Sequence, residues 1–328
     1  MAARSSSFTP RDAGLLIILA LMWGNSFLFV KTAVASIPPG WIVGGRLVIG
    51  ASLLVAICAA RRQSLPRTRR TWLVLGGIGV VGTGLPWFAQ AWAQQALDSG
   101  LVAVLNATTP AATLMLALAF GIERLHLMRV IGLTVAITGS LIVIGGEISG
   151  GGPVVSLAVA VLAPFGYGLG SVLTRRHVSG RIAPLPAAAA QLLGGAIVLN
   201  VLALAVEGPA PGVDTLELVP ALALLALGVF GTGLAFVVYF TLIERVGATN
   251  ASMVTYLVPI VGLIAGSVVR GEQFGPNVFV GAGVLIVGIY LAQRQPAPDP
   301  AGGQTGDRTG ERASPPTELE PSRPAASA

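Results

Sequence analysis

The sequence predicts an all-α integral membrane protein in which ten transmembrane helices form two inverted five-helix repeats. Of its 328 residues, 54% are hydrophobic and 10% are charged, whereas an average soluble domain has about 25% charged residues. The apolar residues are spread over ten stretches of about 20 residues, each long enough to cross a bilayer. A pattern in the first half of the chain recurs in the second half. The composition alone excludes an ordinary soluble enzyme.

Polar or Pro/Gly-rich segments separate the ten spans. We expect the spans at 13–35, 40–60, 71–95, 99–121, 127–145, 153–174, 185–206, 218–242, 248–270 and 276–294. The first span is not a signal peptide, because it is too long for a signal core and contains Trp23, Asn25 and Lys31.

The spans predict four parts along the chain. They are a cytoplasmic arm at 1–11, a first repeat at 12–147, a second repeat at 153–294 and a cytoplasmic tail at 295–328. The tail is rich in Pro, Gly, Ser, Thr and mixed charge. We expect it to be disordered, because it has too few apolar residues to offset the entropy lost on ordering.

One offset relates the two halves. The residues GTGL at 82–85 recur at 231–234, which is 149 residues later, and the same offset joins Pro110 to Pro259, Glu123 to Glu272, Gly132 to Gly281 and Gly139 to Gly288. The front of each half matches more loosely, with Trp23-Gly24 and Lys31 corresponding to Tyr167-Gly168 and Arg175. Because five is an odd number, the second copy enters the membrane from the opposite side. Secondary transporters have this architecture and bind substrate near the midplane between the halves, so it favours transport.

The basic residues indicate the orientation of the chain. If the N-terminus is cytoplasmic, the inner segments carry 14 arginines and the outer loops carry only Arg270. Cytoplasmic loops are enriched in Lys and Arg, so we expect a multi-pass protein of the plasma (inner) membrane with both termini in the cytoplasm. This bias also accounts for the net charge of +6, and no nucleic-acid partner is expected.

Several motifs carry a family resemblance. They are WGNSF at 23–27 with Lys31, then Arg46, GTGLAF at 231–236, GAT at 247–249, YLVP at 256–259 and GE at 271–272. Over about 12–294 the sequence resembles the drug/metabolite transporter superfamily, specifically its EamA-type ten-helix members. The first half departs from the pattern, with DSG at 98–100 where the second half has GAT. The resemblance implies a solute carrier, often an exporter of amino acids, other metabolites or drugs, that works by alternating access.

Two cations, Lys31 and Arg46, lie inside predicted spans. Charges in a membrane are costly, so they mark functional sites by default. Both are candidates for a gate, and Arg46 is a candidate partner for a substrate carboxylate; the alternative for each is snorkelling toward the outer headgroups. All 14 Asp and Glu residues lie at span ends, in loops or in the tail, which argues against an acidic proton relay. For Glu123 and Glu272, capping or ion pairing is favoured over proton coupling.

Uncharged polar and aromatic residues within the spans are further candidates for binding substrate, although such groups also join helices. The resemblance places those of spans three, four, eight and nine at a central cavity. The predicted substrate-binding residues are Trp23, Asn25, Arg46, Gln90, Gln94, Asn106, Thr109, Tyr167, Phe236, Tyr239, Thr255 and Tyr256. Pro110 and Pro259 each remove a backbone donor and are predicted hinges, with a static kink as the alternative. The spacing of Gly262 and Gly266 predicts close helix contact.

The leading functional hypothesis is a secondary transporter that exports amino acids or related amphipathic metabolites across the plasma membrane. A multidrug or other solute carrier of the same superfamily is the alternative, and an integral membrane enzyme or sensor would be a different class. Two His and one Cys provide little for acid–base or metal chemistry, so an enzyme is disfavoured and neither a cofactor nor a metal is expected. The expected partners are a small-molecule substrate and the lipid bilayer; homodimer formation stays open.

Overall fold

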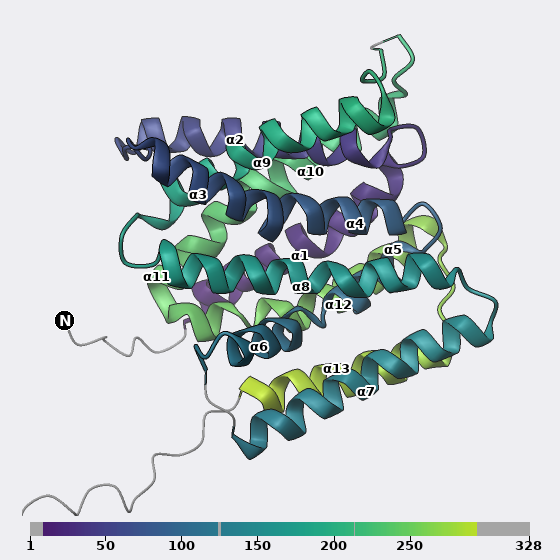
Figure 1. The fold of residues 1–328 in the computed structure, drawn as a ribbon. Helices are drawn as coiled ribbons and strands as arrows, with labels where there is room; N and C mark the ends of the chain where they lie inside the picture. The colour runs from purple at the N-terminus through teal and green to yellow at the C-terminus, as the bar shows by residue number, and fades with distance from the viewer. Residues whose placement is uncertain (1–8, 124–125, 213, 294–328) are drawn as a thin grey trace, which may run out of the picture. The chain divides into compact units, whose positions relative to one another are not determined.

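The computed structural model describes residues 9–123, 126–212 and 214–293. The predicted tail at 295–328 and most of the predicted arm at 1–11 lie outside these residues. The described residues belong to one compact unit, which Figure 1 shows as helices running side by side. They contain helices and no strand, which confirms the all-α prediction.

The first half begins with two uninterrupted helices and continues with two interrupted spans. Thr9 caps α1 through a capping box with Asp12, and Pro39 begins α2 at a position where a missing N–H is harmless. The third span joins α3, η1 and α4, and the fourth joins α5 and α6 across a break at Ala107 and Thr108. The bounds are α1 Pro10–Ala33, α2 Pro39–Ala60, α3 Arg69–Gly79, η1 Val80–Gly84, α4 Leu85–Ala93, α5 Ser99–Asn106, α6 Thr109–Ala119 and α7 Leu127–Ser149.

The second half repeats this order with one marked kink. Its bounds are α8 Val154–His177, α9 Pro184–Glu207, α10 Leu218–Gly228, η2 Val229–Leu234, α11 Ala235–Ala251, α12 Val254–Arg270 and α13 Pro276–Gln293. We expected the eighth span to end at 242, but its helix runs on to Gly247, where φ is 82° and ψ is 163°. This conformation favours glycine, which lacks the Cβ that would clash. The ninth span therefore consists of a short turn at 248–251 followed by α12.

The ten-span prediction is confirmed. In the described residues, nine helical spans are long and apolar enough to cross a membrane, and the remaining predicted span contains the shorter apolar helix Val254–Arg270. That helix is short because Gly247 and the turn at Ser252 and Met253 interrupt the segment before it.

The repeated Gly-Thr-Gly motif forms a π-helical segment in each half, η1 and η2. A π segment widens the helix locally and occurs often at functional sites. In η2 the hydroxyl of Thr232 donates to the carbonyl of Leu227 at 3.1 Å. In the first half Pro86 follows η1 in the first turn of α4 and cannot donate to it. The repeat was visible in the sequence, whereas the π geometry was not predicted.

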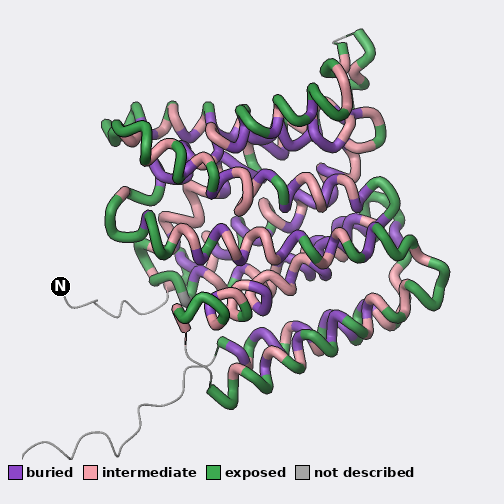
Figure 2. Tube along the Cα trace, in the orientation of Figure 1, coloured by how far each residue is buried: buried purple, intermediate pink, exposed green. Residues whose placement is uncertain are grey.

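Glycines bring α7 and α13 into close contact. A Cβ at Gly132 or Gly139 would meet backbone atoms of α13, and a Cβ at Gly281 or Gly288 would meet backbone atoms of α7. These residues are repeat partners, so the two halves meet symmetrically along this pair, which lies side by side in Figure 1. Figure 2 shows buried residues between the helices and exposed residues on outward faces. Many exposed residues are large and apolar, as lipid contact requires.

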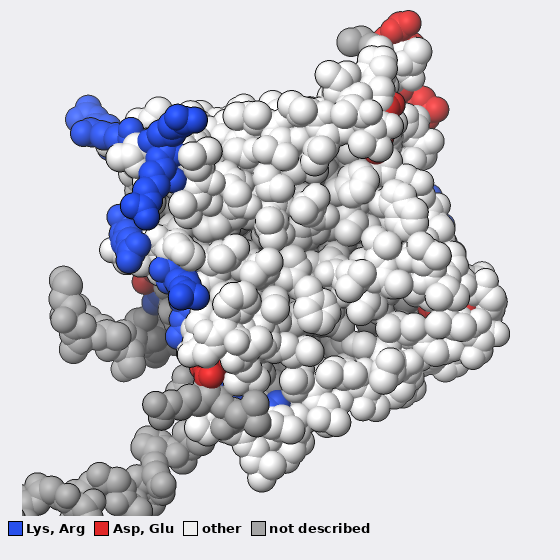
Figure 3. All heavy atoms as spheres, viewed as in Figure 1, with Lys and Arg blue, Asp and Glu red and all other residues white. Residues whose placement is uncertain are grey.

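Arginines gather at one end of the described bundle, and Figure 3 shows them as a blue border where α2 ends, α3 begins and α8 ends. Around these three helix ends the exposed members are Arg61, Arg62, Arg67, Arg69, Arg70, Arg175, Arg176 and Arg181. We call this the arginine-rich end. The connections from α4 to α5, from α9 to α10 and from α12 to α13 lie at the opposite end.

Candidate functional site

Arg46 of α2 is buried in the bundle, with 6% of its surface exposed. Its Nε donates to Thr232 Oγ1 at 2.8 Å, and one terminal NH2 donates to the carbonyl of Gly231 at 3.2 Å. Its guanidinium carbon lies 3.5 Å from the centroid of the Trp87 ring. Both oxygen acceptors belong to η2, so the π segment of the second half holds a cation of the first half. The side chain does not reach the outer headgroups, which was the alternative interpretation.

A chain of neutral hydrogen bonds lies beside Trp87. The hydroxyl of Tyr167 donates to Gln90 Oε1 at 3.1 Å, and Gln90 Nε2 donates to Asn106 Oδ1 at 2.6 Å. Tyr167 also lies against the Trp87 indole. The chain connects α8 with α4 and α5, so three predicted binding residues from three spans meet here.

Aromatic rings of α1 and α11 form a second group. The ring centroids of Trp23 and Tyr239 are 5.1 Å apart, and those of Tyr239 and Phe240 are 5.7 Å apart. Phe236 stacks on Phe240 at 5.9 Å, and both pack against the buried cluster that contains Trp87. We call the combined set the central cluster, which comprises Trp23, Arg46, Trp87, Gln90, Asn106, Tyr167, Thr232, Phe236, Tyr239 and Phe240.

The remaining predicted binding residues are not part of the central cluster. Three of them bond to their own helix or turn. Asn25, Thr109 and Thr255 each donate to a backbone carbonyl three or four residues earlier in the chain. The hydroxyl of Tyr256 donates to Gln293 Oε1 at 2.6 Å and so joins α12 to α13.

Gln94 is 1% exposed, and its side-chain amide has no hydrogen-bond partner among the described residues. It lies at the end of α4 that is opposite to the arginine-rich end.

The two predicted hinge prolines occupy different positions. Pro110 lies in the first turn of α6, directly after the break between α5 and α6, where its missing N–H is harmless. Pro259 lies inside α12, more than a turn beyond the break at Ser252 and Met253. The hinge role of both residues stays a prediction.

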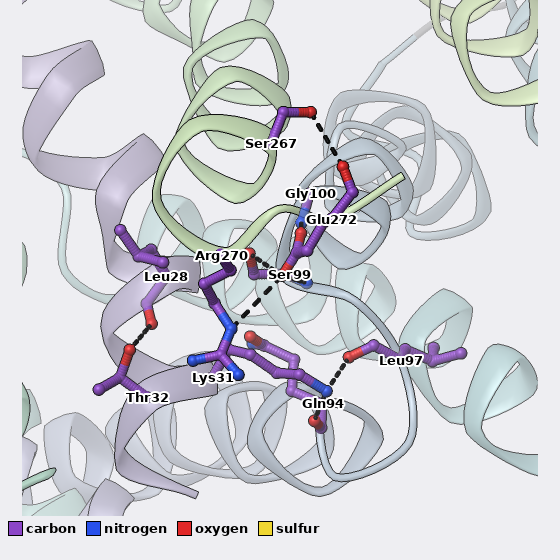
Figure 4. A network of polar contacts seen from close by, with 10 residues as sticks. All are labelled: Leu28, Lys31, Thr32, Gln94, Leu97, Ser99, Gly100, Ser267, Arg270 and Glu272. Atoms are coloured by element: carbon purple, nitrogen blue, oxygen red, sulfur yellow. Dashed lines mark hydrogen bonds and ion pairs between the residues drawn. The ribbon is translucent and has the colours of Figure 1, made fainter. Parts of the chain in front are cut away.

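A polar network lies at the end opposite to the arginine-rich end (Figure 4). Glu272 Oε1 accepts from Ser99 N at 3.0 Å and Ser99 Oγ at 2.8 Å, and its Oε2 accepts from Gly100 N at 3.0 Å. Arg270 Nε lies 3.9 Å from the same carboxylate. The carboxylate therefore caps the N-terminus of α5, which favours negative charge.

Lys31 extends the network on α1. Its Nζ donates to the carbonyls of Gln94 and Leu97, each at 2.8 Å, at the end of α4 (Figure 4). Lys31 is thus bonded to the connection between α4 and α5, and the choice between a gate role and snorkelling stays a prediction. In the adjoining loop, burial raises the pKa of Asp98; the nearby Glu272 raises it further, and Lys31 opposes both effects.

An ion-pair cluster lies at the arginine-rich end. Glu123 Oε1 is 2.6 Å from Arg175 of α8, and its Oε2 is 3.1 Å from Arg129 of α7. The hydrogen bond from Arg175 lowers the pKa of Glu123, and the charge of Arg129 lowers it further. Pairing was the favoured interpretation of Glu123. Arg124, the partner that its position in the hairpin had suggested, lies outside the described residues.

The binding-site prediction did not include Trp87, Thr232 or Phe240. The repeat did contain a signal for Thr232, because the GTGL motif recurs in the segment that faces Arg46. Within the described residues, no three His, Cys, Asp or Glu side chains are grouped to hold a metal. A pocket of about 390 Å³ opens near Arg70, His177 and Arg181 at the arginine-rich end, away from the central cluster.

Comparison with known proteins gives relatives that match most of the chain. It is 28% identical over 285 residues to a protein of Escherichia coli (strain K12) named "Uncharacterized inner membrane transporter YedA", covering 85% of this chain and 89% of that one. It is 27% identical to "Uncharacterized transporter YoaV" of Bacillus subtilis (strain 168), covering 84% and 94%. It is 24% identical to the "Probable amino-acid metabolite efflux pump" of E. coli K12, covering 86% and 94%.

A solved crystal structure shares the fold, with a TM-score of 0.61 at 18% identity over 86% of this chain and 96% of that one. The model of the EamA-like transporter family matches residues 13–145 and 155–293, one match in each half. This family consists of carriers and not of enzymes. The chain is therefore a multi-pass membrane transporter, and it belongs to the EamA-like transporter family.

Proposed function

We propose that this transporter exports small amphipathic metabolites that carry a carboxylate, foremost amino acids, by alternating access. The observation that supports this proposal is the buried guanidinium of Arg46. In the described part of the chain it has a hydroxyl, a carbonyl and an indole ring as partners, and no carboxylate lies within ion-pair distance.

The physical argument concerns the charge of Arg46. A buried cation without a counter-ion is costly, because neutral dipoles replace its hydration only in part. The hydrogen bonds described for it use two of the five N–H groups of a guanidinium. A substrate carboxylate would supply the missing negative charge, and the planar fork suits bidentate binding.

The rest of the central cluster fits the other parts of such a solute. Gln90, Asn106 and Tyr167 offer neutral hydrogen-bonding groups, and the rings of Trp23 and Tyr239 offer apolar contact. The relatives named as probable amino-acid metabolite efflux pumps support both the substrate class and the direction.

We place the protein in the plasma (inner) membrane, with the arginine-rich end of the bundle facing the cytoplasm. Both termini are then cytoplasmic. The arginine bias supports this orientation. The relative named as an inner membrane transporter supports the location. Below, the ends are called cytoplasmic and outer on this basis.

Counterflow into liposomes that contain the purified transporter tests the substrate class. Each labelled amino acid is paired with its methyl ester and its decarboxylated amine, and a set of cationic drugs is included. We expect saturable counterflow of the carboxylate forms alone. Arg46→Gln should weaken their apparent affinity about tenfold to a hundredfold, because a hydrogen bond to a charged group contributes about 1.5–3 kcal/mol.

The matched control is Arg61→Gln, which removes an exposed arginine from the cytoplasmic end of the same helix. We expect it to leave affinity unchanged, and Arg46→Lys to retain part of it. Equal counterflow of esters, amines and carboxylates would contradict the proposal. Selective counterflow of cationic drugs would favour the multidrug alternative, for which the aromatic rings would be the binding surface.

A further inference from the structure

Two glutamates at corresponding positions of the repeat have different structural roles in the two halves. Glu272 of the second half caps α5 of the first half through the N–H groups of Ser99 and Gly100. Glu123, its repeat partner, pairs with Arg175 at the cytoplasmic end and caps no helix among the described residues. The asymmetry is notable because the two halves are otherwise built in the same order.

The repeat also indicates which backbone N–H groups Glu123 would cap. The 149-residue offset converts Ser99 and Gly100 into Ala248 and Thr249, which begin the helical turn after the Gly247 kink. First-turn N–H groups lack partners within their own helix. Ser99 is fully buried, whereas Ala248 is exposed. The turn at 248–251 therefore repeats the N-terminus of α5, and no hydrogen bond between described residues joins a carboxylate to it.

The cations of α1 and α8 differ in the same reciprocal way. Lys31 and Arg175 are repeat partners. Lys31 bonds to the backbone carbonyls at the end of α4, while Glu272 caps α5. Arg175 bonds directly to Glu123. Where the glutamate caps a helix, the cation bonds to backbone carbonyls instead. Where the glutamate caps none of the described helices, the cation pairs with it.

We infer that Glu272 and Glu123 are reciprocal gate residues of the transport cycle. In the observed state Glu272 caps Ser99 and Gly100 and closes the outer side. In the opposite state Glu123 leaves Arg175, caps the N–H groups of Ala248 and Thr249 and closes the cytoplasmic side. Glu272 then leaves α5 and pairs with Lys31. This assignment rests on the proposed alternating-access function and gives it specific residues.

The helix packing agrees with an outer side that is closed. α5 packs against α12 there, and a Cβ at Gly262 would overlap the side chain of Ala103. A Cβ at Gly266 would overlap the Glu272 carboxylate. These contacts bear out the close packing predicted for the two glycines. Toward the cytoplasm, α6 has no packed interface with α11 or α12 in the described residues.

Two reporter cysteines, introduced at repeat-related positions after Cys58→Ser, test the assignment. Ala103→Cys reports on the outer interface, and Ser252→Cys reports on the corresponding cytoplasmic position. Labelling rates with a membrane-impermeant maleimide are measured from each side in oriented proteoliposomes, without substrate. We expect Glu272→Gln to raise outer labelling of Cys at 103 about tenfold and to lower labelling at 252, because a charge-assisted cap is lost. Glu123→Gln should leave 103 protected and 252 reactive.

The matched control is Glu207→Gln. Glu207 also accepts from the first turn of a helix at the outer end, through Gly40 N at 2.9 Å, but it lies between α2 and α9. We expect it to leave both labelling rates unchanged. If Glu272→Gln does not fold, Ser99→Ala removes one bond to the same carboxylate and should shift the labelling in the same direction by less.

A merely structural role would give a different result. Glu272→Gln would then lower the melting temperature while the ratio of the two labelling rates stayed constant, and the gate assignment would be wrong. The same conclusion would follow if Glu272→Gln and Glu123→Gln shifted the ratio in the same direction. The labelling assay needs no substrate, so carboxylate counterflow without the expected shift after Glu272→Gln overturns the gates alone. That shift without carboxylate counterflow overturns the proposed substrate alone.

Discussion

At the scale of single residues, the structure is most informative about how Arg46 is held. Hydrogen bonds to a charged group contribute about 1.5–3 kcal/mol, and a desolvated cation–π contact contributes about 2 kcal/mol. The Thr232 hydroxyl, the Gly231 carbonyl and the Trp87 ring therefore orient the guanidinium. They orient it without neutralising its charge.

Thr232→Val tests this division of roles. Valine keeps the shape of the side chain but removes the oxygen that accepts from Arg46 Nε at 2.8 Å. We expect the free energy of unfolding to fall by about 1–3 kcal/mol, since a buried donor loses its partner, and the KM for a carboxylate substrate to rise. The control is Thr83→Val, the repeat partner in η1, which should change KM little. Equal increases in KM for both variants would show that Thr232 does not act through Arg46.

At the scale of helices, each predicted span was found, but the π segments and the kink at Gly247 inside them were not predicted. Length and apolar content locate a span, because any helix that crosses a bilayer must satisfy both. They do not show how the backbone bends inside it. Pro110 and Pro259 correspond in sequence, yet one begins a helix and the other lies within one. Packing against neighbouring helices decides which local geometry forms. Those contacts cannot be deduced from a single sequence.

Helix packing can be tested at the contact between α8 and η1. A Cβ at Gly170 would overlap Gly82, so Gly170→Ala should force the two backbones apart and lower stability by about 1–3 kcal/mol. Gly77→Ala in α3 is the control, because its Cβ would meet nothing within 4 Å. Alanine is the better helix former, so this variant should be neutral or stabilising. Thermal unfolding in detergent measures both, and a similar loss in both variants would argue against the close contact.

At the scale of the whole molecule, the sequence predicted the inverted repeat and a candidate site but not the conformational state. Of the predicted binding residues, Arg46, Gln90, Asn106 and Tyr167 come together, whereas Tyr256 joins α13 instead. The state is not readable because, in the proposed cycle, the same sequence contains the residues for both closures. The preference for the observed state has a steric component: the outer interface has Gly262 and Gly266, and their repeat partners are Thr113 and Ala117.

The carboxyls near the two ends predict that only the outer end responds to mild acid. The pKa of Asp98 is raised in this outer-closed state, by burial and then by Glu272; Lys31 opposes these effects, while Glu147 and Arg270 act more weakly in opposite directions. Because this state binds the proton more tightly than a solvated one, lowering the outer pH should stabilise outer closure and slow labelling of Cys at 103 by more than it slows the reaction of the maleimide with a free thiol. The pKa of Glu123 is lowered by Arg175, so its ion pair should persist until the cytoplasmic pH falls below about 4.3, the usual value for Glu. Asp98→Asn should reduce the response to outer pH to that of a free thiol. An equal response to cytoplasmic pH between 6 and 8 would show that the ends do not titrate in this way.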